Sequence, residues 1–192
     1  MLANSAFALV TALSPSPDCL KKFYDNVEKY KKYIILRPQE VANSPEVARR
    51  IGVIAMNTAI EVDIYGNVNS THICGTKIMN GIGGSGDYAR NGYLTVFFTT
   101  SLAKGGAISS VVPFCSHVDH TEHDVDVIVS ERGVADLRGL SPKERALVII
   151  DKLLIRNINR CFLITSRELA KLVAIAKLRI LWMKLSPSMI VS

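Results

Sequence analysis

Three of the serine–proline pairs in this chain separate segments with alternating helical and extended patterns. They stand at Ser16-Pro17, Ser44-Pro45 and Ser141-Pro142. A serine can cap the first N–H groups of a helix, and proline fits the first helical position because its missing N–H needs no partner there. The sequence therefore predicts three helices that begin at these prolines.

The residues after the first and third pairs support this prediction. Ser141 and Glu144 have the spacing of a capping box. Apolar side chains recur at helical spacing after both pairs, at Leu20, Phe23, Tyr24, Val27 and Tyr30 and at Leu147, Ile150 and Leu154.

Extended patterns lie between these helices. Residues 59–65 alternate between apolar and polar side chains, Gly66-Asn67 favours a tight turn, and residues 68–73 form a second extended segment. This pattern predicts a β-hairpin. Aromatic and β-branched residues favour further strands at 93–98, 125–129 and, more weakly, 108–114. Because helices and strands share one core, the predicted class is α/β.

The net charge of +6 does not indicate a nucleic-acid surface. Residues 152–192 contain eight lysines and arginines but only one glutamate, so the preceding residues are close to neutral. The apolar and basic residues of this tail are irregularly spaced. We expect it to lie outside the packed core, and an amphipathic helix resting on a membrane is the alternative.

Other classes are excluded by simple patterns. The four scattered cysteines form no CxxC pair, which argues against a zinc ribbon or a disulfide framework and fits a reducing compartment. No uncharged apolar run is long enough for a membrane span. The apolar start lacks a basic region before it, so we do not expect secretion.

The strongest local signal is a glycine-rich stretch, residues 80–87, which we call the glycine loop. Four glycines allow the backbone to approach a ligand, and the N–H groups of such a turn can hold a phosphate or an oxyanion. It matches GxGxxG but lacks the flanking strand and helix of a dinucleotide site, so a plain tight turn is the alternative. Lys104, beside Gly105-Gly106, could reach a phosphate or an acyl oxygen, or be a solvated lysine.

Residues 117–123 combine three histidines with two carboxylates. These residue types are metal ligands, but their spacing matches no common zinc pattern. A metal-dependent hydrolase is therefore one hypothesis, and a polar hydrogen-bonded turn is the other. No GxSxG elbow or activated cysteine is evident, and Glu61 in the predicted hairpin is interpreted as a solvent-facing residue.

Several runs are informative when taken together and in order: 37–40, 43–46, 61–66, 69–72, 79–87, 116–124 and 135–140. They resemble the C-terminal domain of the acetyl-CoA hydrolase/transferase family, which includes succinyl-CoA:acetate CoA-transferases. The resemblance extends from about Leu20 to about Asp151.

The resemblance implies a CoA-transferase-like open sheet domain with flanking helices. It also implies a reaction in which a glutamate attacks an acyl-CoA thioester to form an anhydride and then a glutamyl-CoA thioester. A carboxylate such as acetate then takes the CoA, or water hydrolyses the thioester. Acyl-CoA and acetate would be substrates, with no permanently bound cofactor, and the intact family member would be a homodimer.

The resemblance assigns contacts with CoA or the acyl group to Ile60, Asn80, Gly84 and Lys104. It assigns neither a catalytic residue nor a metal ligand to this chain, since the family's nucleophilic glutamate would precede Ser5. We therefore expect a fragment that is inert unless a partner supplies this glutamate. A binding module without turnover is the alternative.

The expected organisation is a partial family domain over residues 1–151 and a divergent basic tail over residues 152–192. After Asp151 the chain departs from the family's usual histidine-proline-aspartate-tyrosine stretch, which suggests a truncated gene product with an unrelated tail. The expected location is the cytoplasm or a mitochondrial-type organelle.

Overall fold

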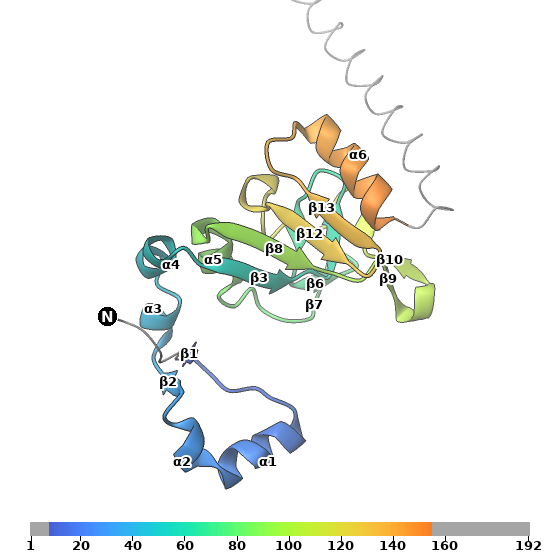
Figure 1. The fold of residues 1–192 in the computed structure, drawn as a ribbon. Coiled ribbons are helices and arrows are strands. Elements are labelled where there is room, and N and C mark those ends of the chain that lie inside the picture. Colours follow the sequence, from blue (N-terminus) through green and yellow to red (C-terminus); the bar gives the residue numbers. More distant parts are fainter. Residues whose placement is uncertain (1–7, 155–192) are drawn as a thin grey trace, which may run out of the picture.

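The computed structural model describes residues 8–154 and has a mixed α/β fold with open sheets and flanking helices (Figure 1). This confirms the predicted fold class. The expected boundary at residue 151 falls within the last described helix, and the rest of the predicted tail lies outside the described residues.

A four-stranded sheet in the order β13-β12-β8-β3 forms the centre of the fold. The first three of its strands in chain order are parallel, and the last is an antiparallel edge strand. The strands are β3 (Ile54–Thr58), β8 (Leu94–Phe98), β12 (Val127–Ser130) and β13 (Gly133–Asp136). The sequence patterns predicted β8 and β12, whereas β3 and β13 were missed.

A smaller sheet, in the order β11-β4-β5, contains the predicted hairpin. Its strands are β4 (Glu61–Asp63), β5 (Val68–Asn69) and β11 (Val111–Val112). The Asp63 carboxylate accepts backbone hydrogen bonds from residues 65, 66 and 67, which closes the turn at Gly66. Two-stranded ladders join β6 (His72–Ile73) to β7 (Lys77–Ile78) and β9 (Leu102–Ala103) to β10 (Ile108–Ser109).

Three helices begin where the serine–proline pairs predicted: α1 (Pro17–Asp25), α4 (Pro45–Ile51) and α6 (Pro142–Leu153). The others are α2 (Val27–Tyr30), α3 (Gln39–Ala42) and α5 (Ser85–Asn91), with 3-10 turns η1 (Lys104–Gly106) and η2 (Glu122–Asp124). Ser141 and Glu144 form the predicted capping box. The first predicted helix is divided at Asn26, and α5 was not predicted.

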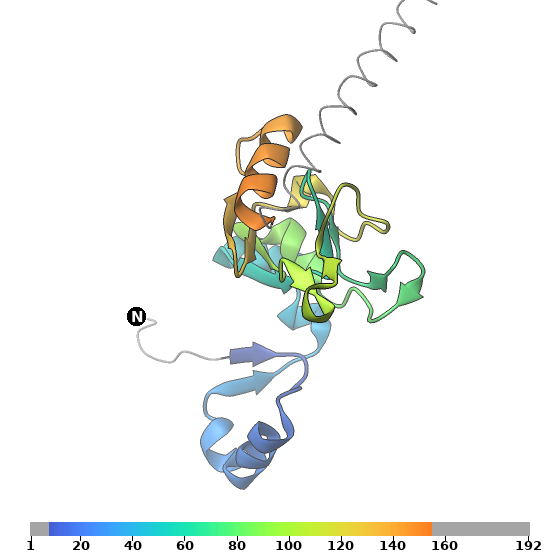
Figure 2. The same ribbon diagram turned by 90° about the vertical axis from the view of Figure 1, so that its right-hand side faces the viewer.

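The N-terminal segment forms a separate small unit. Strand β1 (Ala8–Val10) pairs in parallel with β2 (Ile34–Leu36), and α1 and α2 lie between them in the chain. Both ribbon views show α1 and α2 set apart from the two sheets (Figures 1 and 2), whereas residues 9–12 border a hollow with Met56 and Asn57 of β3.

The hydrophobic core lies between the two sheets and α6. Phe97 and Ile128 of the central sheet are fully buried, as are Val62 of the smaller sheet and Ile149 of α6. Burial of such side chains is the main favourable term for folding. The core fixes the ends of β3, β4 and β8, from which the loops of the candidate site emerge.

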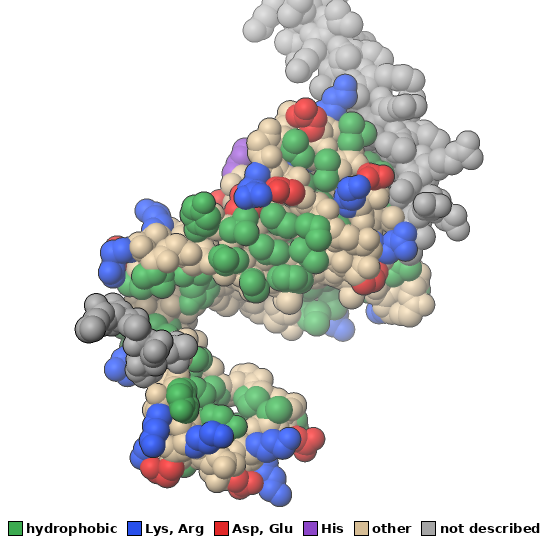
Figure 3. All heavy atoms as spheres, viewed as in Figure 1, with side chains coloured by type: hydrophobic (Ala, Val, Ile, Leu, Met, Phe, Trp, Pro, Cys, Tyr) green, Lys and Arg blue, Asp and Glu red, His purple; other side chains and the backbone are tan. Residues whose placement is uncertain are grey.

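The outer face of the central sheet is apolar and open among the described residues. Ile54, Met56, Phe98 and Val134 expose between 39% and 68% of their surface. Figure 3 shows the apolar patch over the strands of this sheet. Parallel strands normally have both faces covered, so this face has the composition of a buried surface. No helix within residues 8–154 is long and apolar enough to cross a membrane.

Candidate functional site

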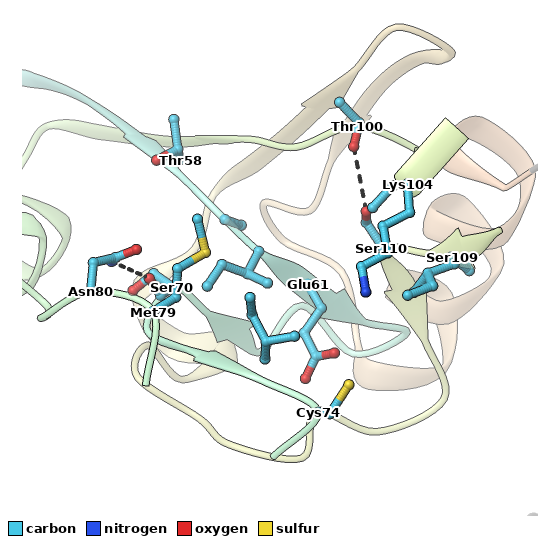
Figure 4. A pocket seen from close by; sticks show the side chains of 15 residues that line it. Thr58, Glu61, Ser70, Cys74, Met79, Asn80, Thr100, Lys104, Ser109 and Ser110 are labelled. Carbon is cyan, nitrogen blue, oxygen red and sulfur yellow. Dashed lines mark hydrogen bonds between the residues drawn. The ribbon is translucent and has the colours of Figure 1, made fainter. Parts of the chain in front are cut away.

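A cavity of about 450 Å³ opens where the loops of the two sheets meet (Figure 4). Its walls come from the β3–β4 connection, the hairpin ladder β6–β7 and the β8–β10 segment. The lining residues are Thr58, Ala59, Ile60, Glu61, Ser70, Ile73, Cys74, Met79, Asn80, Thr100, Ala103, Lys104, Ile108, Ser109 and Ser110. Three of the four predicted contact residues thus line one cavity.

Hydrogen bonds fix the positions of both Ile60 and Asn80 in the cavity wall. The Ile60 N–H donates to the Asn69 carbonyl at 2.9 Å, which fixes the β3–β4 connection against β5. The Asn80 Nδ2 group donates to the carbonyls of Ser70 at 2.8 Å and Gly81 at 3.1 Å. Asn80 therefore holds the start of the glycine loop against the end of β5.

Lys104 reaches the cavity from a strained turn. Its φ is 49°, and Gly105 and Gly106 follow at 65° and 99°, all in the left-handed region that glycine tolerates best. Its side chain extends into the cavity in Figure 4. An exposed ammonium at this place can pair with a phosphate or an acyl oxygen.

The segment that carries Lys104 is held by Glu131. The Ser101 N–H lies 2.9 and 3.1 Å from the two Glu131 carboxylate oxygens, and the Ser101 hydroxyl donates to the same carboxylate. These hydrogen bonds, with that from the hydroxyl the strongest, hold the pKa of Glu131 below its usual value. The end of β12 thereby fixes the start of the lysine-bearing loop.

Gly84 lies outside this cavity, at the N-cap of α5. It borders a separate hollow with Asn43, Ser85 and Tyr88. A Cβ at Gly84 would overlap the Asn43 side-chain amide, so a larger residue here would force that amide to turn away. The structure thus brings Ile60, Asn80 and Lys104 together in one cavity. Gly84 lies outside this cavity, further along the glycine loop that begins at Asn80.

The family model of the acetyl-CoA hydrolase/transferase C-terminal domain matches residues 20–153. This match covers more than half of the chain. The chain belongs to the acetyl-CoA hydrolase/transferase family. The resemblance seen in the sequence runs is therefore confirmed.

Curated relatives of the family include CoA-transferases and hydrolases. The chain is 67% identical over 141 residues to a succinyl-CoA:acetate CoA-transferase from Clostridium kluyveri, covering 73% of this chain and 26% of the relative. It is 58% identical over 144 residues to a propanoyl-CoA:succinate CoA transferase from Escherichia coli, covering 75% and 29%. An acetyl-CoA hydrolase from Candida albicans is 53% identical over 150 residues, covering 76% and 29%.

Solved structures give the same fold. RipA from Yersinia pestis matches with a TM-score of 0.65 at 26% identity, covering 78% of this chain and 33% of that chain. A 4-hydroxybutyrate CoA-transferase from Porphyromonas gingivalis matches with a TM-score of 0.63 at 23% identity, covering 84% and 37%. This chain therefore spans about a third of these structures and less than a third of the curated relatives above.

Within this family domain, sequence reasoning missed the position of Glu61. Its carboxylate lines the cavity instead of facing bulk solvent, and its Oε1 accepts hydrogen bonds from Asn69 Nδ2 at 3.0 Å and Ser116 Oγ at 2.9 Å. Val62, next along β4, points into the core, so Glu61 must face the opposite side of the strand. In the predicted hairpin Glu61 lies opposite Asn69, and this pairing was the signal in the sequence for a hydrogen-bonded carboxylate.

The histidine-rich segment of the family domain does not converge on one point, although His117 Nε2 lies 3.4 Å from Asp119 Oδ1. His120 is buried beneath the glycine loop, Asp119 accepts hydrogen bonds from Ser70 and Thr71, and His123 is exposed. Among residues 8–154, no three histidine, cysteine or acidic side chains are placed to hold a metal ion. The structure does not support the metal-dependent hydrolase hypothesis.

Cys115 lies close to Glu61 but is no candidate nucleophile. Burial raises the pKa of its thiol, and the nearby carboxylates of Asp63 and Glu61 raise it further. The thiolate is the nucleophilic form of cysteine, so this environment keeps the side chain unreactive.

Proposed function

We propose that this chain supplies the CoA-binding part of a CoA-transferase or acetyl-CoA hydrolase. The intact site would move CoA between an acyl-CoA, such as acetyl-CoA or succinyl-CoA, and a carboxylate such as acetate. CoA is a substrate in this proposal, and no permanently bound cofactor is needed. The observation that carries the proposal is the convergence of Ile60, Asn80 and Lys104 on one cavity.

The chemistry of the cavity wall suits the parts of CoA. Ile60, Ile73 and Met79 offer apolar surface to the pantetheine arm. Lys104 offers a positive charge to a phosphate or to the acyl oxygen. Asn80 brings the start of the glycine loop to the cavity, where a side-chain amide or a backbone N–H can serve an oxyanion that forms when the thioester carbonyl is attacked.

The covalent steps need a carboxylate that this chain is not proposed to supply. A glutamate attacks the thioester carbonyl and CoA thiolate leaves, which forms an acyl-glutamyl anhydride. The thiolate then attacks the glutamyl carbonyl, releases the acyl group as a carboxylate and leaves a glutamyl-CoA thioester. Glu61 lines the cavity, but its Oε1 already accepts hydrogen bonds from Asn69 and Ser116, so we do not assign it the role of nucleophile.

The open face of the central sheet supports the need for a further polypeptide. Apolar side chains of parallel strands are normally covered on both faces, and Met56 exposes 68% of its surface here. The relatives contain more than two thirds of their length beyond the matched part. If this chain is an enzyme fragment, a partner that carries the glutamate would restore turnover. If the chain is only a CoA-binding module, it would bind CoA without turnover even when mixed with such a partner.

Calorimetric titration with CoA tests the proposal. Lys104→Ala should weaken binding by about tenfold or more, since a charge-assisted hydrogen bond contributes about 1.5–3 kcal/mol. Lys143→Ala, on an exposed lysine of α6, is the matched control and should leave the affinity unchanged. Equal affinities of the two variants would contradict the cavity as the CoA site.

Incubation with acetyl-CoA tests the absence of the nucleophile. Intact-mass measurement should find no CoA adduct on this chain and no thioester hydrolysis. A glutamyl-CoA adduct on this chain alone would contradict the proposal that the glutamate comes from elsewhere.

A further inference from the structure

One histidine of the family domain lies beneath the glycine loop and outside the cavity. His120 is 1% exposed, and its ring packs against Phe97 with 4.9 Å between ring centroids. Its backbone is paired with Val68, whose N–H donates to the His120 carbonyl at 2.8 Å and whose carbonyl accepts from the His120 N–H at 3.1 Å. The ring is therefore fixed to the core and cannot move with the loop above it.

The hydrogen-bond order between this ring and the loop follows from the groups involved. The Ser85 hydroxyl lies 2.7 Å from the Ile82 carbonyl, which can only accept, so Ser85 donates its single hydrogen there. His120 Nε2 lies 3.0 Å from the same hydroxyl oxygen. Nε2 must then carry a hydrogen and donate it, which gives the order His120, Ser85, Ile82.

This chain of hydrogen bonds closes the turn before α5. Gly83, at a φ of 57°, lies inside the turn. Asn80 fixes the other end of the loop through the Ser70 carbonyl, as described above. The glycine loop is thus held at Asn80 by β5 and at Ser85 by the core.

We propose that His120 is a positioning residue that holds the glycine loop in its ligand-binding conformation through Ser85. The ligand in this statement, CoA or its acyl group, rests on the proposed function. The positioning itself rests only on the hydrogen bonds and burial described above. His120 touches no substrate in this proposal.

The environment of the ring agrees with a fixed donor. Burial lowers the pKa of His120, and Arg90 acts in the same direction, whereas Asp119 and Asp124 oppose the shift. A neutral ring with its hydrogen on Nε2 satisfies Ser85 without placing a charge in the core.

Hydrogen exchange over residues 80–87 tests the positioning without any ligand. His120→Leu removes the donor and fills the space, whereas His120→Gln keeps an N–H group near the position of Nε2. Exchange of the loop amides should become about tenfold faster in His120→Leu, since a hydrogen bond from a buried group is lost. His120→Gln should recover most of the protection.

Ser85→Ala removes this hydrogen bond together with the one to the Ile82 carbonyl, and leaves the core intact. It should accelerate exchange at least as much as His120→Leu, and adding His120→Leu to it should give no further increase, because His120 acts on the loop through Ser85. Unchanged loop exchange in Ser85→Ala, or an equal increase in α6 and in the loop, would overturn the proposal. CoA affinity is measured in parallel: failure of the parent chain to bind CoA would refute the proposed function and leave the exchange result valid.

Discussion

The side-chain amide of Asn43 occupies the space where a Cβ on Gly84 would lie. Asn43 comes from the segment between α3 and α4, and Gly84 comes from the start of α5, so this contact joins two parts of the chain 41 positions apart. Tyr88 strengthens the junction, because its hydroxyl donates to the Ala42 carbonyl at 2.5 Å. The glycine loop is therefore held by the segment between α3 and α4 as well as by His120.

Gly84→Ala should therefore disturb both the fold and the site. We expect a loss of about 1 kcal/mol or less in the free energy of unfolding, because the overlapping atoms are the end of the Asn43 side chain, which can turn away. CoA affinity should fall with it. Urea denaturation and calorimetry measure the two effects.

Gly81→Ala is the matched control for this substitution. Gly81 has no positive φ, and a Cβ there would meet nothing within 4 Å. The control should retain the parent stability and affinity. If Gly84→Ala matched it in both, the close approach of Asn43 would have no energetic weight.

Two neighbouring phenylalanines on β8 test the packing of the central sheet. Phe97 is fully buried and Phe98 is 39% exposed on the outer face. Phe97→Ala should lower the free energy of unfolding by about 3–5 kcal/mol, whereas Phe98→Ala should cost about 1 kcal/mol or less. Similar losses measured by urea denaturation would show that the outer face is covered in solution.

Acidification should destabilise the fold through His120. Its pKa is lowered by burial in the folded chain, so the unfolded chain binds a proton more readily. The stability that comes from neutral His120 should be fully present above pH 6.5, the usual pKa of histidine, and should decline as the pH falls toward the pKa of His120 in the folded chain. Urea denaturation between pH 7.5 and 5.5 should show a shallower decline for His120→Gln; equal slopes would refute the assignment.

Glu131 should control the loop that carries Lys104. Glu131→Gln retains the shape but weakens acceptance from Ser101, so CoA affinity should fall several-fold while the unfolding transition changes little. Because the pKa of this exposed Glu131 is lowered in the folded chain, its contact with Ser101 adds a small contribution to stability above the ordinary pKa of glutamate, and this contribution is lost as the pH falls below that value. Calorimetry at pH 7 checks the variant, and Arg132→Gln, on the adjacent exposed residue, should bind normally.

Local signals predicted much of the fold. The serine–proline pairs placed the starts of α1, α4 and α6 because capping is decided by neighbouring residues. Strand β8 followed from its aromatic and β-branched residues. Strand β3 was missed because its own residues give no clear strand pattern, and its pairing with β8 defines it. Helix α5 was missed because the glycines before it indicate a turn.

The site was predictable only in part for the same reason. Asn80, Gly84 and Lys104 lie in glycine-rich turns that stand out in the sequence, and Ile60 followed from the family resemblance alone. The placement of Glu61 at the cavity and of His120 beneath the loop depends on contacts with Ser116 and Ser85, which are 55 and 35 positions away. Such distant partners leave no periodic pattern.

The central claim is that the cavity between Ile60, Asn80 and Lys104 receives CoA. A crystal structure of this chain grown with CoA tests it most directly. The account predicts density for the pantetheine arm along Ile60 and Met79, with a CoA oxygen within hydrogen-bond distance of Lys104 Nζ. An empty cavity under saturating CoA, or CoA bound elsewhere on the chain, would contradict it.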